Sequence, residues 1–126
     1  MGTAVSPSLI GISFATTLSF VSTASALDQQ SALANAQTAA QNYINNLAKG
    51  QQFVINTLAD RIQSSDANIL DVGSPDRPIQ SIYLWRSRDD GTRYSRTLIG
   101  NFQPAVGERI LVETSISNPI NLTAAS

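Results

Sequence analysis

A long amphipathic segment, Ser25–Gln63, restricts the possible folds more than any other feature of this sequence. Its apolar residues recur at alternating intervals of three and four positions, a spacing that places side chains along one face of a helix. The stripe consists of Leu33, Ala36, Ala40, Tyr43, Leu47, Val54 and Leu58, widened by Ile44, Ile55 and Ile62. Alanine, leucine and glutamine favour helices, and no proline interrupts the segment. The pattern predicts one long helix over residues 25–63.

Two positions bear on the course of this helix. Ser25 followed by Asp28 resembles a capping box, in which each side chain accepts a hydrogen bond from the other residue's backbone N–H. Gly50 is either an interior glycine, which costs a helix about 1 kcal/mol relative to alanine, or the residue that ends a first helix. We expect a continuous helix that bends at Gly50.

The polar face of the predicted helix carries few charges. Its charged residues are Asp28, Lys49, Asp60 and Arg61, and the other polar residues are glutamine, asparagine, serine and threonine. Uncharged polar side chains can hydrogen-bond across a protein contact without the desolvation cost of a buried charge. The face is therefore either an ordinary solvated surface or, as we favour, a surface covered by neighbouring copies of the chain.

The overall composition also indicates contacts with protein. The chain has 126 residues, which suits one domain or a small domain with an arm. Charged residues make up 13%, about half the usual share, and Lys49 is the single lysine beside seven arginines. Arginine is preferred over lysine at protein interfaces. The formal net charge of -1 provides no general attraction to nucleic acid or to an anionic membrane.

Cysteine and histidine are both absent from the sequence. Thiolate chemistry, the usual general base and the usual zinc ligand are therefore missing, and a classical hydrolytic triad cannot form. No glycine-rich phosphate-binding loop is present. Asp66, Asn68 and Asp71 lie close together, but their spacing does not match a calcium-binding loop. We predict a non-enzymatic protein with no catalytic residue, no cofactor and no metal site.

Residues 1–24 are predicted to form an extended N-terminal arm. Apolar residues alternate with small or polar ones within Leu9–Val21, which is the period of a half-buried strand. The apolar row is Ile10, Ile12, Phe14, Leu18 and Phe20. A strand of this kind at a terminus suits an arm that adds to the sheet edge of another subunit.

Other interpretations of this N-terminal segment stay open. An apolar stripe through Ile10, Phe14, Leu18 and Val21 is also compatible with a helix. A secretory signal peptide over residues 1–26 is a third interpretation, although no basic residue precedes the apolar part. The apolar part is too short for a membrane-spanning helix, which needs about 20 residues.

The second half of the chain is predicted to be a loop followed by a small sheet. Residues 64–78 form a connector rich in proline and glycine, with Ile69–Val72 as a short strand inside it. Residues 79–126 form an antiparallel meander with a C-terminal tail. The expected strands are Gln80–Arg88, Thr92–Gly100 and Glu108–Ile116, and the first two flank an Asp-Gly turn that is typical of a hairpin. The tail, 117–126, would be pinned by Ile120 and Leu122.

The predicted hairpin concentrates arginine and aromatic side chains: Tyr83, Trp85, Arg86, Arg88, Arg93, Tyr94 and Arg96. Arginine between aromatic residues can bind nucleic acid. It can also pair across strands within the hairpin, or anchor a subunit contact. We favour the subunit contact and do not expect a nucleic-acid partner.

These parts together predict an α+β fold whose arm, helix and sheet each need a partner. We predict a structural subunit of a large symmetric assembly, with a bacteriophage virion protein (capsid decoration, tail or neck) as the first choice. Its partners would be copies of itself and other subunits of the same particle. The predicted contact residues are Ile10, Ile12, Phe14, Leu18, Phe20, Tyr43, Leu47, Trp85, Arg86, Arg88, Arg93, Tyr94 and Arg96. The alternatives are a secreted or cell-surface binding module and a small nucleic-acid-binding protein.

Overall fold

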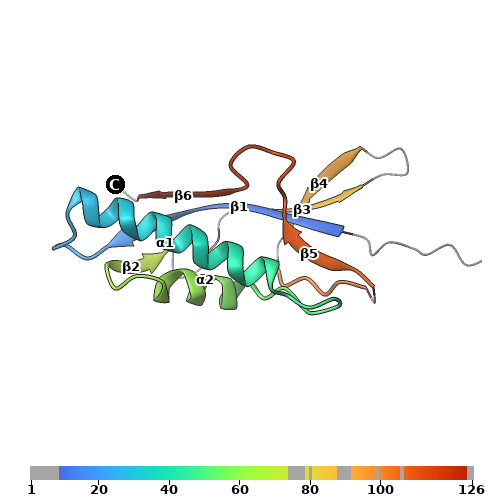
Figure 1. Ribbon diagram of the computed structural model, residues 1–126, viewed down its shortest axis with the longest axis horizontal. Helices are drawn as coiled ribbons and strands as arrows, with labels where there is room; N and C mark the ends of the chain where they lie inside the picture. The colour runs from blue at the N-terminus through green and yellow to red at the C-terminus, as the bar shows by residue number, and fades with distance from the viewer. Residues whose placement is uncertain are drawn as a thin grey trace, which may run out of the picture.

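The computed structural model describes residues 9–73, 79, 81–87, 92–98, 100–105 and 107–124. It confirms the predicted α+β class, with two helices packed on one face of a six-stranded sheet (Figure 1). The helices are α1 (Ala26–Asn45) and α2 (Ile55–Ser64). The strands are β1 (Leu9–Phe20), β2 (Ile69–Val72), β3 (Ser81–Ser87), β4 (Arg93–Thr97), β5 (Arg109–Val112) and β6 (Ile120–Ala124).

The long strand β1 lies at the centre of this sheet. Antiparallel β2 and β3 pair with one of its edges, and β5 and β6 pair with the other edge in parallel. The predicted N-terminal strand is therefore confirmed, but it does not act as a free arm. Both of its edges are hydrogen-bonded within the chain, so neither is open to the sheet of another subunit.

The predicted hairpin is present as β3 and β4, which pair antiparallel from Tyr83 opposite Thr97 to Ser87 opposite Arg93. Its predicted turn at Asp89–Gly91 lies outside the described residues. The third predicted strand, β5, pairs with β1 and not with β4, because this position buries Ile110 and Val112 against α1.

The predicted C-terminal tail contains a strand, β6, which pairs with β1 over residues 14–18. Ile120 is buried in the core and Leu122 packs at its margin, as expected of residues that pin the tail. The short strand predicted in the connector is also confirmed as β2.

The chain forms two helices where one long helix was predicted. α1 ends at Asn45, and α2 starts at Ile55 and returns alongside α1 (Figure 1). One helix over residues 25–63 would be about 58 Å long, whereas a strand of the length of β1 spans about 40 Å. The second half of such a helix would extend beyond the sheet. Folding back instead buries Leu58 and Ile62 completely.

Gly50 lies in the loop between the helices rather than inside a helix. Its φ angle of 78° is in the left-handed region, which glycine adopts without steric cost. The loop is held at this residue and again three residues later. Gly50 N–H donates to Glu108 O at 2.9 Å, and Phe53 pairs through its backbone with Phe102.

A single hydrophobic core fills the space between sheet and helices. From α1 it receives Ala32, Ala36, Ala40 and Ile44, one residue per turn, so α1 meets the sheet mainly through small side chains. The predicted capping box is confirmed, since Asp28 N–H donates to Ser25 Oγ at 3.1 Å and Ser25 N–H donates to Asp28 Oδ2 at 3.0 Å. Among the described residues, no helix is long and apolar enough to cross a membrane.

Candidate functional site

The sheet face turned away from the helices carries small residues on β1 and aromatic residues on β3. In the antiparallel register, Gly11 lies opposite Trp85, and Ser13 lies opposite Tyr83. Alternate residues of β1 point to opposite sides of the sheet. The large apolar side chains of β1 therefore enter the core, and its small ones leave room beside the two aromatic rings.

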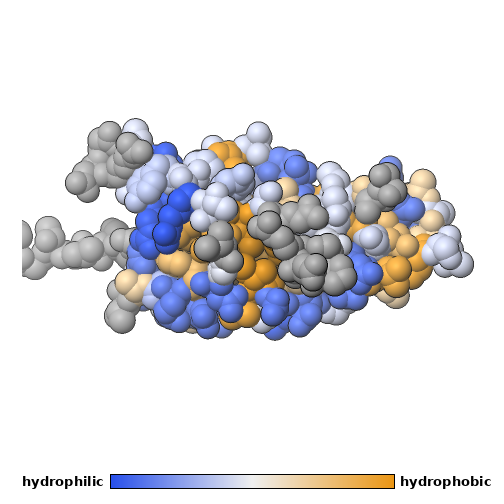
Figure 2. All heavy atoms as spheres, turned by 180° about the vertical axis from the view of Figure 1, so that it is seen from behind, coloured by the Kyte–Doolittle hydropathy of each residue, from blue (hydrophilic) through white to orange (hydrophobic). Residues whose placement is uncertain are grey.

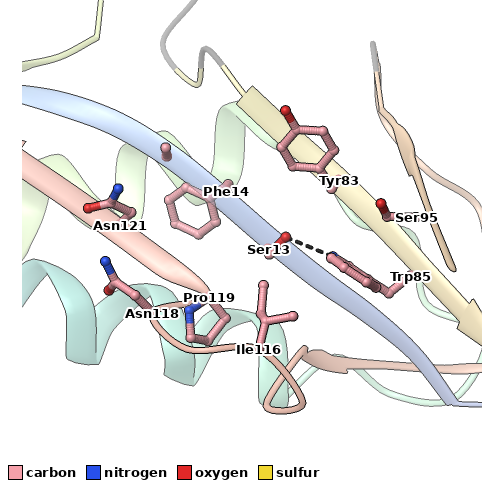
Figure 3. Close-up of a pocket in the computed structure, with 10 residues that line it drawn as sticks. Ser13, Phe14, Tyr83, Trp85, Ser95, Ile116, Asn118, Pro119 and Asn121 are labelled. Carbon is pink, nitrogen blue, oxygen red and sulfur yellow. Dashed lines mark hydrogen bonds between the residues drawn. The ribbon is translucent and has the colours of Figure 1, made fainter. Parts of the chain in front are cut away.

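This room forms a hollow of about 280 Å³ on the open face. Figure 3 shows Tyr83 and Trp85 side by side along β3, with Ser13 next to them and Asn118 and Asn121 on the far side of β1. The hollow is lined by Ser13, Phe14, Ala15, Tyr83, Trp85, Ser95, Ile116, Asn118, Pro119 and Asn121. None of these side chains carries a formal charge at neutral pH, so the hollow is suited to an uncharged occupant.

The indole of Trp85 is fixed in place. Its Nε1–H donates to Ser13 Oγ at 2.8 Å, a bond between residues 72 positions apart in the chain (Figure 3). Ser13 is buried and Trp85 half-buried, so this hydrogen bond satisfies the polar atoms of both side chains. The wall that Trp85 contributes is therefore formed before any ligand arrives.

An ion pair crosses the sheet next to the hollow. The guanidinium of Arg93 on β4 donates to both oxygens of the Glu113 carboxylate, with Nε at 3.1 Å from Oε2. Glu113 follows β5, on the opposite edge of β1, so the pair passes over Gly11 of the central strand. A side chain at position 11 would occupy the space of the Glu113 carboxylate. The glycine is therefore needed for this bridge.

Burial and pairing act in opposite directions on the pKa of Glu113. Burial of the carboxyl, the largest single influence, raises the pKa, because the charged form loses hydration. Hydrogen bonds from Arg93 and Ser115, together with the positive charge of Arg93, outweigh burial and lower the pKa below its ordinary value. Glu113 is 3% exposed and remains a carboxylate at neutral pH.

A second ion pair anchors the loop before β5. Arg86 Nη1 donates to Glu108 Oε2 at 2.6 Å, and the guanidinium lies 5.5 Å from the ring centre of Phe102. The pKa of Glu108 is also lowered: burial raises it, but a backbone hydrogen bond from Ala105 and the contact with Arg86 have the greater combined effect. Arg86 and Arg93 therefore act within the chain, and their charges are already compensated.

Several predicted contact residues lie in the protein's own core. Ile10, Ile12, Phe14, Leu18 and Leu47 are all buried there. Phe20 and Tyr43 pack at the margin of the core, where the hydroxyl of Tyr43 contacts the backbone of Val54. The five buried side chains are used within the chain's own core, whereas Phe20 and Tyr43 remain partly exposed.

The hairpin residues are divided between several environments. Trp85 lines the hollow, Tyr94 is half-buried, and Arg96 is exposed on β4. Arg88 lies outside the described residues. Because Arg86 and Arg93 pair with carboxylates, the described part of the hairpin does not form the cluster of free cations that a phosphate backbone attracts.

Asp66, just after α2, organises a turn. Asp66 Oδ1 accepts a hydrogen bond from Asn68 N–H at 2.8 Å, and Oδ2 accepts one from the side chain of Asn35 at 2.9 Å. The bond from Asn68 is the main reason that the pKa of Asp66 is lowered. In the described part of the chain, no group of three or more carboxylates is arranged to hold a metal ion.

The exposed face of α1 carries almost no charge. Asp28 is the single charged residue in the twenty residues of this helix. The exposed residues are Ala26, Leu27, Asp28, Gln30, Ser31, Ala34, Asn35, Gln37, Thr38, Asn42 and Asn45. Leu27, at the start of the helix, is 72% exposed. Figure 2 shows apolar surface at the end of the molecule where α1 begins, and also near the centre of the face opposite to Figure 1.

The hollow was not predicted from the sequence, although Tyr83 and Trp85 were predicted to lie on the hairpin rich in arginine and aromatic residues, and Trp85 to be a subunit contact. The small residues of β1 alternate with its apolar ones and could have indicated a strand face with room beside it. No sequence pattern indicated that Asn118 and Asn121 would lie at the hollow. They reach it because β6, near the end of the chain, pairs in parallel with β1.

No protein family model, curated protein or solved structure matches this sequence.

Proposed function

We propose that this chain is a non-enzymatic structural subunit of a large symmetric assembly, and within that class a bacteriophage virion protein of the capsid decoration, tail or neck type. The observation that supports the proposal is the exposed face of α1. Eleven residues of this helix are exposed and one of them, Asp28, is charged. A helix that stays in water normally carries many charged residues, often paired four positions apart.

The proposed contact surface keeps the charge-poor helix face that the sequence favoured and leaves out the apolar row of β1. Four side chains of the apolar row of β1, those of Ile10, Ile12, Phe14 and Leu18, are buried in the chain's own core and are not proposed as contacts. The exposed glutamines and asparagines of α1 can exchange hydrogen bonds with the same residues of a neighbour, and its exposed alanines allow close approach. Leu27 adds a large apolar side chain at one end of this surface. The α1 face is therefore the proposed subunit contact.

A secretory role is not part of the proposal. Cleavage after residue 26 would remove β1, the strand to which β2, β3, β5 and β6 all pair. A nucleic-acid-binding role is not included either, because Arg86 and Arg93 are neutralised by carboxylates within the chain.

The first test is the intact mass and elution volume of the native protein, purified from its source on a sizing column. A chain that retains β1 and elutes with a large particle would support the proposal. A chain that begins near Leu27, or one that elutes only as a small species from an intact source, would overturn it.

A second test adds charge to the α1 face without changing its shape. Gln30 and Gln37 are exposed and lie two helical turns apart, and replacing both with glutamate introduces two negative charges in side chains of the same size. We expect the double variant to associate at least about tenfold more weakly, because the new charges must be desolvated in the contact. Gln52→Glu, in the exposed part of the interhelical loop, is the matched control. Equal association of all three proteins would exclude the α1 face as the contact.

A further inference from the structure

We propose that the hollow on the open face of the sheet binds a single uncharged sugar ring. The inference does not depend on the assembly role, because the hollow lies on the sheet and the proposed subunit contact lies on α1. It rests on three properties of the hollow: its size, its aromatic wall and its uncharged polar groups.

The size of the hollow limits the occupant. Its volume of about 280 Å³ lies just below the range of about 300–1,000 Å³ that is typical of pockets for drug-sized ligands. A folded segment or a multi-residue peptide would not enter it, whereas one six-membered ring would. The lining contains no carboxylate, guanidinium or ammonium group, so nothing in it favours a charged ring over a neutral one.

The aromatic wall suits the C–H face of a sugar. Tyr83 is 41% exposed and lies next to Trp85 on β3, where both rings border the hollow (Figure 3). The face of an aromatic ring carries partial negative charge, and it attracts the partially positive C–H groups on one side of a pyranose. Because the hydrogen bond to Ser13 already holds the indole, little ordering of this wall is needed when a ligand binds.

The opposite side of the hollow offers free hydrogen-bonding groups. Within the described part of the chain, the side chains of Asn118 and Asn121 form no hydrogen bond, and neither does that of Ser95, which lies beside Trp85 on the aromatic side (Figure 3). Each amide provides two N–H donors and one acceptor oxygen, and each hydroxyl both donates and accepts. Sugar hydroxyls have the same mixed capacity. An apolar side chain of a protein partner would instead bury these amides without partners, which is costly.

The backbone of Asn118 gives additional support. Its φ angle of 56° lies in the left-handed region, the one such case among the described non-glycine residues. Asparagine tolerates this conformation better than most residues, but it is still uncommon. The strained backbone places the Asn118 side chain at the hollow just before Pro119 and β6 (Figure 3). Strained positions of this kind are concentrated at functional sites.

The test uses the indole N–H of Trp85, which gives a single NMR signal because the chain contains one tryptophan. The full chain is titrated with glucose, galactose, mannose and N-acetylglucosamine, each as the free sugar and as its methyl glycoside. We expect a saturable shift of the indole signal with at least one of them. Binding of the methyl glycoside would assign the site to the end of a sugar chain, and binding of the free sugar alone would assign it to a monosaccharide.

Three variants and a control locate the binding. Tyr83→Ala and Asn121→Ala should each weaken binding by about tenfold, which corresponds to about 1.4 kcal/mol. Tyr83→Phe keeps the ring and should retain most of the affinity. Gln52→Ala changes an exposed residue of the interhelical loop, outside both the hollow and the α1 face, and should bind as the unmodified chain does. The dispersed amide spectrum of each variant shows whether it is folded.

Two results would overturn the proposal. One is the absence of any saturable shift with all eight compounds at about 100 mM, a concentration well above the millimolar Kd of a weak complex. The other is a saturable shift with N-acetyl-phenylalanine amide or N-acetyl-leucine amide but with no sugar. That result would assign the hollow to a side chain of a protein partner.

Discussion

Gly11 shows how a single residue can determine the chemistry of a sheet face. It lies on the central strand between Trp85 on β3 and Leu111 on β5. Without a side chain at this point, the Glu113 carboxylate passes over the strand and reaches Arg93. The ion pair then connects the two edges of β1 on the face that carries the hollow.

Gly11→Ala should destabilise the protein by at least about 2 kcal/mol. The new methyl group would overlap the Glu113 carboxylate and approach Arg93 Nη2 to 2.8 Å, so that a buried ion pair must shift or break. Urea unfolding at pH 7 gives the free energy of unfolding. Gly100→Ala is the matched control, because an added methyl group there has no neighbour within 4 Å and should change stability by less than about 0.5 kcal/mol. Equal effects of the two substitutions would contradict the proposed role of Gly11.

The pairing of Glu113 also predicts how stability depends on pH. Its pKa is lower in the folded chain than the ordinary value of 4.5, so the unfolded chain binds the proton more tightly. The stabilising contribution is complete above pH 4.5 and is lost as the pH falls through the lower pKa of the folded state. We expect the free energy of unfolding to fall as the pH is lowered below 4.5.

Glu113→Gln tests this dependence, since glutamine cannot titrate. The variant should be less stable at pH 7, and its stability should decline less steeply towards pH 3. A residual decline is expected because the pKa values of Glu108 and Asp66 are also lowered. An unchanged slope would show that Glu113 does not contribute to it.

At the scale of elements, the segment between α1 and α2 determines how the helices cover the sheet. Phe53 is fully buried in this segment and pairs through its backbone with Phe102. The ring of Phe53 also lies 6.1 Å from that of Tyr43 on α1. The loop is therefore fixed to the core at a point just before α2 begins, which sets the direction in which α2 returns.

Phe53→Ala should cost about 3–5 kcal/mol, the range for removing a buried aromatic ring and leaving a cavity. Gln52→Ala changes the exposed residue next to it and should stay within about 0.5 kcal/mol of the unmodified chain. Thermal and urea unfolding of both variants would measure the difference. A loss of less than about 1 kcal/mol for Phe53→Ala would mean that the loop is not anchored by this ring.

At the scale of the whole molecule, β1 holds the sheet together. It pairs with four other strands, and β4 reaches it through β3. Its inward-facing side chains meet α1 and α2 in one core. The fold therefore cannot be divided into an arm, a helix and a separate sheet, although the sequence suggested these as successive parts.

A chain that starts at Leu27 should fail to form the native structure. Without β1, the remaining strands lose both their hydrogen-bonding partner and the apolar row that covers the helices. We expect such a chain to show no cooperative thermal unfolding and poor dispersion of its amide NMR signals. The full chain should unfold cooperatively and give well-dispersed amide signals. Cooperative unfolding of the truncated chain would contradict the central role of β1 and reopen the signal-peptide interpretation.

The sequence by itself determined the features that depend on near neighbours. Alternation over Leu9–Val21 predicted the strand, three- and four-residue spacing predicted helix, and the capping box at Ser25 and Asp28 was correct to the residue. The Asp-Gly turn predicted the pairing of β3 with β4. Each pattern reflects the period of an element or a contact across a few residues, so it can be recognised without knowing the rest of the fold.

The tertiary structure decided everything that depends on distant residues. The break between α1 and α2 is set by the length of the sheet that they cover, which no local pattern specifies. The central place of β1 requires parallel partners from the end of the chain. At the hollow, Ser13 of β1 accepts a hydrogen bond from Trp85 of β3. The ion pair between Arg93 and Glu113 requires a glycine at position 11, beneath the Glu113 carboxylate. These contacts link positions far apart in the sequence, and they become visible only when the packed core has fixed the register of the strands.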